Sequence, residues 1–172
     1  MTPTGGAKRA LVIIARRWSS LDAEIRDLDQ AICTILDTIA APLLARHGVG
    51  YETAGTLLCT AGDNPDRLTT EASFASLCGT APVPVSTGNS NRRRLNRAGD
   101  RNANSALWTI VMVRLRSHHA PTVAYLERRV TERHSKRDAI RRLKRFVARE
   151  VYLDIRAITT PRQHEAQLKI AP

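Results

Sequence analysis

A hydroxyl pair beside a run of arginines is the part of this sequence whose residue types suit a chemical reaction. Ser86 and Thr87 are followed by a glycine and then by five arginines within ten residues: Arg92, Arg93, Arg94, Arg97 and Arg101. Guanidinium groups bind phosphate through paired hydrogen bonds. A serine hydroxyl attacks a phosphodiester when the charge that grows on the phosphoryl oxygens is neutralised. The segment therefore favours contact with nucleic acid, and a solvated charged loop is the alternative.

The positive charge of the chain lies in its second half. Residues 1–90 contain 7 Lys and Arg against 9 Asp and Glu, whereas residues 91–172 contain 20 against 7. This imbalance predicts a polyanionic partner. Basic helices that bind membranes usually carry aromatic anchors, and only 4% of this chain is aromatic. We therefore expect nucleic acid as a partner, and no membrane.

The cysteines and the N-terminus indicate a protein of the cytoplasm. Cys33, Cys59 and Cys78 are spaced too widely for a disulfide framework or a zinc site. No group of carboxylates has the pattern of metal ligands, so we expect no metal in this chain. The apolar run Leu11–Ile14 is short and two arginines soon follow it, which excludes a signal peptide and a membrane span.

A heptad seam occupies the first quarter of the chain. Apolar residues alternate at spacings of 3 and 4 over Leu11, Ile14, Trp18, Leu21, Ile25, Leu28, Ile32, Ile35 and Ile39. The pattern predicts one long helix that lies along another helix. A helical hairpin within the chain and a dimer with a second copy both fit this seam.

A glycine turn follows the break at Pro42. Gly48 and Gly50 separate two short apolar segments, as in a helix-hairpin-helix element. In such a turn, glycines let backbone N–H groups approach a phosphate at a helix N-terminus. A plain corner between two helices is the alternative.

The rest of the chain predicts a mainly α fold. We expect helices from Thr69 or Thr70 to Gly79, over 103–117, over 122–132 and over 137–157. Residues 80–104 have no helical period and predict a loop, with a short ribbon at Val83 and Val85. The predicted organisation is a coiled-coil helix over 1–41, a helical domain over 42–158 and a disordered tail over 159–172.

Two segments carry a family resemblance. They are "HGVGYETAGTLLCTAGDNPDRLTTEASFASLCGTAPVPVSTGNSNRRRLNRAGDRNANSALWTIVMVRLR" and "YLERRVTERHSKRDAIRRLKRFVAREVY". They resemble the C-terminal half of the DEDD-type insertion-sequence transposases of bacteria, the group often called IS one-ten. The similarity extends from about Ala10 to Tyr152.

The resemblance implies a function in DNA transposition. Such transposases join an N-terminal nuclease domain, whose four acidic residues hold magnesium, to a coiled coil and a helical C-terminal domain. That last domain carries a serine that links covalently to DNA, and part of the family uses a structured guide RNA. The resemblance implies that Gly48 and Gly50 contact DNA and that the Leu11–Ile39 seam pairs with another copy.

The resemblance also assigns roles within the arginine segment. Family members have Ser-Ser-Gly or Gln-Ser-Gly where this chain has Ser86, Thr87 and a glycine. The expected nucleophile is Ser86, with Thr87 as second choice. The five arginines of this segment are then expected to hold the scissile phosphate and its neighbours.

This sequence departs from the family pattern in one respect, because it lacks the acidic N-terminal nuclease domain. We therefore expect a truncated transposase that acts as an enzyme only as part of a larger transposase. Magnesium is expected only with the missing acidic domain. The alternatives are a non-catalytic nucleic-acid-binding module that pairs with or titrates a full-length transposase, and a packaging protein. The expected location is the bacterial cytoplasm, at the nucleoid when bound to DNA.

Overall fold

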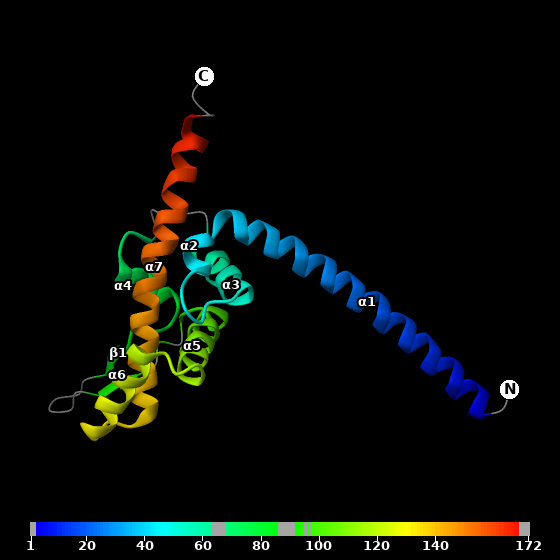
Figure 1. The fold of residues 1–172 in the computed structure, drawn as a ribbon, viewed down its shortest axis with the longest axis horizontal. Helices are drawn as coiled ribbons and strands as arrows, with labels where there is room; N and C mark the ends of the chain where they lie inside the picture. Colours follow the sequence, from blue (N-terminus) through cyan, green and yellow to red (C-terminus); the bar gives the residue numbers. More distant parts are fainter. Residues whose placement is uncertain (1–2, 63–67, 86–91, 95, 97, 169–172) are drawn as a thin grey trace. The chain divides into compact units, whose positions relative to one another are not determined.

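A computed structural model describes most of the chain. The backbone is described for residues 3–62, 68–85, 92–94, 96 and 98–168, and side chains for the same residues except 3–4, 84–85, 92–94 and 160–168. Contacts divide the chain into two compact units, residues 1–38 and residues 39–172. In the described part, helices predominate, which confirms the predicted mainly α fold (Figure 1).

The first unit consists of one long helix, α1, Pro3–Ile39. It contains the whole heptad seam, because no proline or glycine interrupts the chain between Leu11 and Ile39. Seam residues from Leu11 to Ile35 are 40–67% exposed. Within its own unit, the helix therefore presents an exposed apolar stripe.

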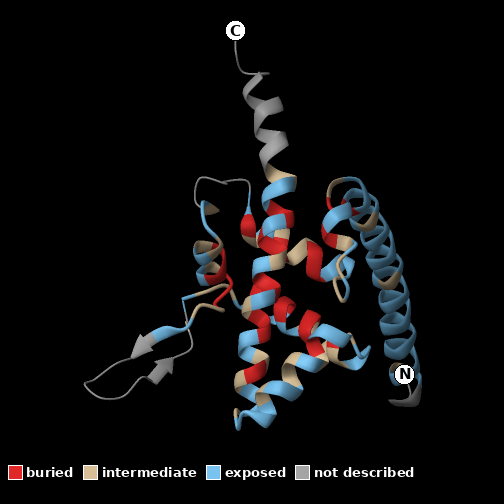
Figure 2. Cartoon of the chain, turned by 60° about the vertical axis from the view of Figure 1, so that its left-hand side comes forward, coloured by how far each residue is buried: buried red, intermediate tan, exposed pale blue. Residues whose placement is uncertain are grey.

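The second unit is built around the last long helix. Its helices are α2 (Ala41–Leu44), α3 (Tyr51–Ala61), α4 (Glu71–Leu77), α5 (Arg101–Arg116), α6 (Ala120–Thr131) and α7 (Lys136–Leu168). Helices α2, α4, α5 and α6 all contact α7, and α3 packs on α5. Figure 2 shows buried residues along the middle of α7 and on the helices that face it. The largest fully buried side chains are Phe74, Leu43, Leu57, Leu107, Ile110, Val111, Val147 and Val151.

Helix starts in this unit follow the sequence signals. Thr70 precedes α4, and its hydroxyl accepts a hydrogen bond from the Ser73 backbone N–H at 3.1 Å. Asp100 precedes α5 and accepts from the Ala103 N–H at 2.9 Å. Each cap satisfies an N–H group that has no partner inside its helix. The predicted start at Thr69 or Thr70 is confirmed with Thr70 as the cap.

Two short strands lie within the segment predicted as a loop with a ribbon. Strand β1 (Val83–Val85) pairs antiparallel with β2 (Arg92–Arg94). The register sets Val83 opposite Arg94 and Val85 opposite Arg92. The ribbon at Val83 and Val85 is confirmed, and its partner strand is the arginine triplet.

The C-terminal helix is longer than predicted. Helix α7 continues to Leu168, whereas the sequence predicted a helix end near residue 157 and a disordered tail from residue 159. The described part of that tail, residues 159–168, is helical. Pro161 disfavours a helix at this point, but residues 163–168, QHEAQL, include strong helix formers that favour continuation. Among the described residues, no helix has the length and apolar character needed to cross a membrane.

Candidate functional site

The segment that carries the predicted nucleophiles joins the two paired strands. Ser86, Thr87 and Arg97 lie outside the described residues, and Arg92–Arg94 are described by their backbone alone. Val85, which directly precedes Ser86 in the sequence, is paired with Arg92. Strand pairing therefore brings the first arginine of the run opposite the residue next to the predicted nucleophile.

Strands β1 and β2 together form a two-stranded ribbon. Its base is closed by contacts between the end of α4 and the start of α5. A Cβ atom on Gly99 would collide with the backbone of Gly79, so the chain at these two glycines is in close approach. The Asp100 N–H donates to the Leu77 carbonyl oxygen at 2.6 Å. These contacts hold the end of α4 against the start of α5. They fix where the ribbon leaves the helical unit and where it returns.

Arg101 is the arginine of the run whose side chain is described. It is the first residue of α5 and is exposed. Its position directly after the Asp100 cap sets it at the returning end of the ribbon. Arg101 thus lies close along the chain to β2, and the expected phosphate contact of its guanidinium remains a prediction.

The two glycines of the predicted hairpin have different surroundings. Gly48 has a φ of +82°, and a Cβ there would lie 3.0 Å from Arg114 Cγ and 3.1 Å from the Ile110 carbonyl oxygen. Gly50 caps α3 with an extended backbone, and a Cβ there would meet nothing within 4 Å. Gly48 therefore serves close packing of the turn on α5, whereas Gly50 faces open space. The predicted DNA contact of this turn is better suited to Gly50.

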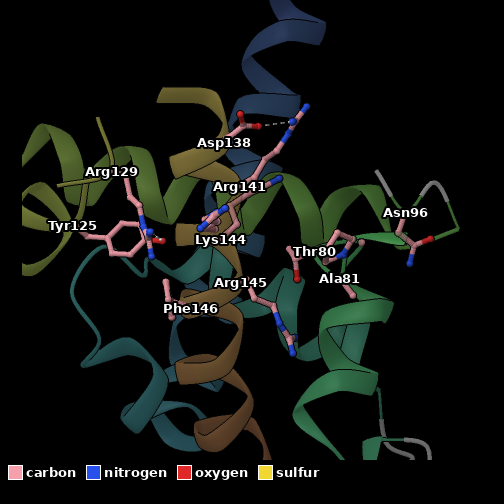
Figure 3. Close-up of a pocket in the computed structure, with 13 residues that line it drawn as sticks. Thr80, Ala81, Asn96, Tyr125, Arg129, Asp138, Arg141, Lys144, Arg145 and Phe146 are labelled. Carbon is pink, nitrogen blue, oxygen red and sulfur yellow. Dashed lines mark hydrogen bonds and ion pairs between the residues drawn. The ribbon is translucent and has the colours of Figure 1, made fainter. Parts of the chain in front are cut away.

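A cationic pocket lies next to the base of the ribbon, and sequence analysis did not foresee it. Its volume is about 790 Å³. One wall is formed by residues 79–82 and Asn96, which flank the ribbon, and the rest by α6 and α7. In Figure 3, Thr80 and Asn96 lie on one side, Tyr125 on the other, and side chains of α7 between them. Its charged lining residues are Arg129, Arg141, Arg142, Lys144, Arg145 and Asp138.

Three of the arginines in this pocket form ion pairs. Arg141 Nη1 lies 2.8 Å from Asp138 Oδ1, and Arg129 Nη1 lies 2.7 Å from Glu132 Oε2. The third pair joins the Arg145 guanidinium to a Glu71 carboxylate oxygen at 3.0 Å. For Arg142 and Lys144, no ion pair is formed within the described part of the chain. The cluster therefore keeps an excess of positive charge.

Lys144 is the buried member of the cluster. The residue is 8% exposed, and its Nζ donates to Asn104 Oδ1 at 2.7 Å. Burial, and then the charge of Arg141, lower the pKa of Lys144. A buried ammonium with a neutral acceptor is costly, and a nearby anion reduces that cost.

A second polar cluster lies at the corner between α5 and α6. His47 Nε2 and Ser117 Oγ are 2.6 Å apart, and the rings of His47 and His119 stack with centroids 4.8 Å apart. His119 Nδ1 also contacts the Thr122 hydroxyl at 2.8 Å. Burial, and then the charge of Arg114, lower the pKa of His119. The cluster fixes the corner on which the glycine turn packs.

The signals for the cationic pocket were present in the sequence but separate. The spacing of α7 already set Arg141, Arg142, Lys144 and Arg145 off its main apolar face. Nothing in the sequence indicated that Arg129 of α6 lies beside them, because that depends on tertiary packing of α6 on α7. Local patterns report the faces of a helix and not its neighbours.

Residues 40–127 match the family model described as Transposase IS116/IS110/IS902 family. The matched range includes the glycine turn and the ribbon, and it ends within α6 at residue 127. No curated protein matches the chain. Among the described residues, no group of three or more His, Cys, Asp or Glu side chains is arranged to hold a metal ion.

Proposed function

The chain belongs to the IS116/IS110/IS902 transposase family, whose role is DNA transposition, and we propose that it takes part in strand cleavage and joining through Ser86. The observation that carries this proposal is the strand register, in which Val85 pairs with Arg92. It supports a hydroxyl at Ser86 beside the start of an arginine run. Both features lie inside the range matched by the family model.

The chemistry of this step follows from the residue types. The Ser86 hydroxyl loses its proton to solvent as its oxygen forms a bond to phosphorus, and the bond from phosphorus to the leaving deoxyribose oxygen breaks. The leaving oxygen then takes up a proton. The DNA phosphodiester becomes a protein phosphodiester, so attack by another DNA hydroxyl reverses the link and joins strands. Guanidinium groups from Arg92–Arg94, Arg97 and Arg101 would stabilise the charge on the phosphoryl oxygens.

The metal chemistry expected of the family does not fit the described residues of this chain. They offer no group of three or more His, Cys, Asp or Glu placed to hold magnesium. We propose that the acidic residues are supplied by a further polypeptide segment, which this chain needs for complete strand exchange. The same observation favours a second candidate, a non-catalytic nucleic-acid-binding module that pairs with or titrates a full-length transposase.

The seam of α1 supports association with a second copy. Its residues from Leu11 to Ile35 are exposed at alternating spacings of 3 and 4, which is the arrangement of a coiled-coil interface. We propose a homo-oligomer through the Leu11–Ile39 seam. Replacing Ile25 and Leu28 by Asn and Glu would then shift the mass measured by light scattering towards the monomer. An unchanged mass would exclude the seam as the interface.

A covalent-adduct experiment tests the proposed function. The purified chain is incubated with element-end DNA and magnesium, with and without a full-length family member, and analysed on a denaturing gel. We expect a protein–DNA adduct that requires the full-length member, is lost in Ser86→Ala and persists in Thr87→Ala. Loss in Thr87→Ala alone would transfer the role to Thr87. Salt-sensitive binding without any adduct would favour the binding module.

The same assay covers the RNA partner that the resemblance implies. Adding the structured RNA of the element to matched reactions would raise adduct yield if that RNA positions the DNA. Equal yields with and without the RNA would contradict its participation.

A further inference from the structure

The cationic pocket beside the ribbon has the features of a nucleic-acid site that is separate from Ser86. We propose that it binds the phosphate backbone of an unpaired nucleic-acid strand, with Phe146 stacking on a base. The choice of nucleic acid over other polyanions rests on the family's role in DNA transposition. The proposal does not require Ser86 to be the nucleophile.

Uncompensated charge is the first observation that supports this site. Five cations and Asp138 line the pocket, and Glu132 and Glu71 form ion pairs with two of the cations. Arg142 and Lys144 form no ion pair with any carboxylate in the described part of the chain. Arg142 is an exposed residue, so a phosphate reaches it without displacing an ion-pair partner from the described part of the chain. Phosphate contacts of this kind supply most of the affinity for a nucleic-acid backbone.

The buried ammonium of Lys144 is the second observation. Its Nζ has three hydrogen-bond donors, and Asn104 Oδ1 is the acceptor that the described structure provides. The residue is more than nine-tenths buried and lines the pocket. A phosphate oxygen in the pocket would accept a further hydrogen bond and offset the cost of burying this charge.

An exposed aromatic ring among the arginines is the third observation. Phe146 is 45% exposed although it lines the pocket, and it meets Tyr125 edge-on at a centroid distance of 5.3 Å. Arg142 stands four residues before Phe146 on α7, so both lie on one face of the helix. Aromatic rings beside a positive groove are the stacking platforms of single-strand binding sites.

The size and position of the pocket indicate an unpaired strand. A volume of about 790 Å³ falls within the range of small-ligand pockets, roughly 300–1,000 Å³, and suits single nucleotides rather than a double helix. Residues 79–82 lead directly into β1, and Asn96 follows β2 by two residues. A strand held in the pocket would therefore continue towards the ribbon that carries the arginine triplet.

Equilibrium binding of labelled oligonucleotides tests the site. Fluorescence anisotropy would compare four 20-nucleotide probes: oligo(dT), oligo(U), an abasic DNA strand and a blunt DNA duplex. All proteins would carry Ser86→Ala, so the assay reports binding without covalent chemistry. Failure of Ser86 in the adduct experiment would then leave this result unaffected.

Arg142→Ala tests the phosphate contact, and Arg137→Ala is its matched control. Both are exposed arginines of α7, but Arg137 does not line the pocket. We expect Arg142→Ala to weaken oligo(dT) binding about fivefold or more and to lower the salt slope by about 1. Arg137→Ala should change affinity less than about twofold. Equal effects of the two substitutions would overturn the proposal.

Phe146→Leu tests the stacking contact. It should weaken oligo(dT) binding about fivefold, and it should leave the abasic strand unchanged because that probe has phosphates but no bases. An equal loss on both probes would overturn the stacking role. Tighter binding of oligo(U) than of oligo(dT) would assign the strand as RNA, and tighter binding of the duplex would overturn the preference for an unpaired strand.

Discussion

Replacing Gly48 by alanine should destabilise the helical unit strongly. Two costs add. Residue 48 has a φ of +82°, and a non-glycine residue in that region costs about 1–2 kcal/mol. The new Cβ would also lie 3.1 Å from the Ile110 carbonyl oxygen and 3.0 Å from Arg114 Cγ. Arg114 has little freedom to move, because Nε donates to the His47 carbonyl at 2.8 Å and Nη2 to Glu150 at 2.8 Å. Overpacking of this kind costs about 1–3 kcal/mol, so the two costs together give a loss of about 2–5 kcal/mol.

Gly50→Ala is the matched control for that experiment. It lies in the same turn, but its φ is −111° and a Cβ there meets nothing within 4 Å. Replacement of this N-cap glycine should cost less than about 1 kcal/mol. Urea unfolding followed by circular dichroism would give both free energies. Equal losses for the two variants would refute the assignment of Gly48 to packing. If Gly50 allows close approach of a phosphate, Gly50→Ala should weaken DNA binding while leaving the fold intact.

Three further predictions concern polar side chains of the helical unit. Asp154→Asn should lower the free energy of unfolding by about 1–3 kcal/mol, because Asp154 is buried and accepts two hydrogen bonds from Arg46, at 2.8 and 2.9 Å. Urea titration would measure this loss, and an unchanged unfolding midpoint would contradict the prediction. Because the pKa of His119 is lowered below its usual 6.5, the folded state favours the neutral ring and should lose stability as pH falls through 6.5. Between pH 8 and pH 5, the melting temperature should therefore fall less steeply in His119→Gln than in the unchanged protein. Parallel curves for the two proteins would contradict this role of His119. Burial, and then the charge of Asp100, raise the pKa of the Cys78 thiol to about 12. At pH 8, a thiol reagent should therefore modify exposed Cys59 first and Cys78 only after unfolding. Equal rates of modification at Cys59 and Cys78 would contradict the burial of Cys78.

The helices were predictable because their signals are local. The seam from Leu11 to Ile39 fixed α1, and Thr70 marked the start of α4. These features depend on residues three or four positions apart, which share a helix face, and on caps that act within one turn. Sequence therefore indicated element types well, with the largest difference at the C-terminal end of α7.

The pairing of the two strands, and the meeting of residues from different helices in one pocket, were harder to predict. The triplet Arg92–Arg94 lacks the alternation and β-branched residues of a strand, and it becomes β2 because β1 lies beside it. The pocket likewise joins Arg129 of α6 to Arg142 and Phe146 of α7, which only tertiary packing brings together. The glycine turn shows the same limit, since the close approach of Gly48 to α5 depends on tertiary packing, while its predicted contact with DNA stays a prediction.

Mass spectrometry of the protein–DNA adduct tests the central claim most directly. Cleavage by trypsin after Arg67 and Arg92 releases a peptide of residues 68–92, which contains Ser86 and Thr87. After nuclease digestion, a nucleotide should remain attached to this peptide, and fragmentation should assign it to the Ser86 oxygen. Attachment at a residue outside this peptide would contradict the account.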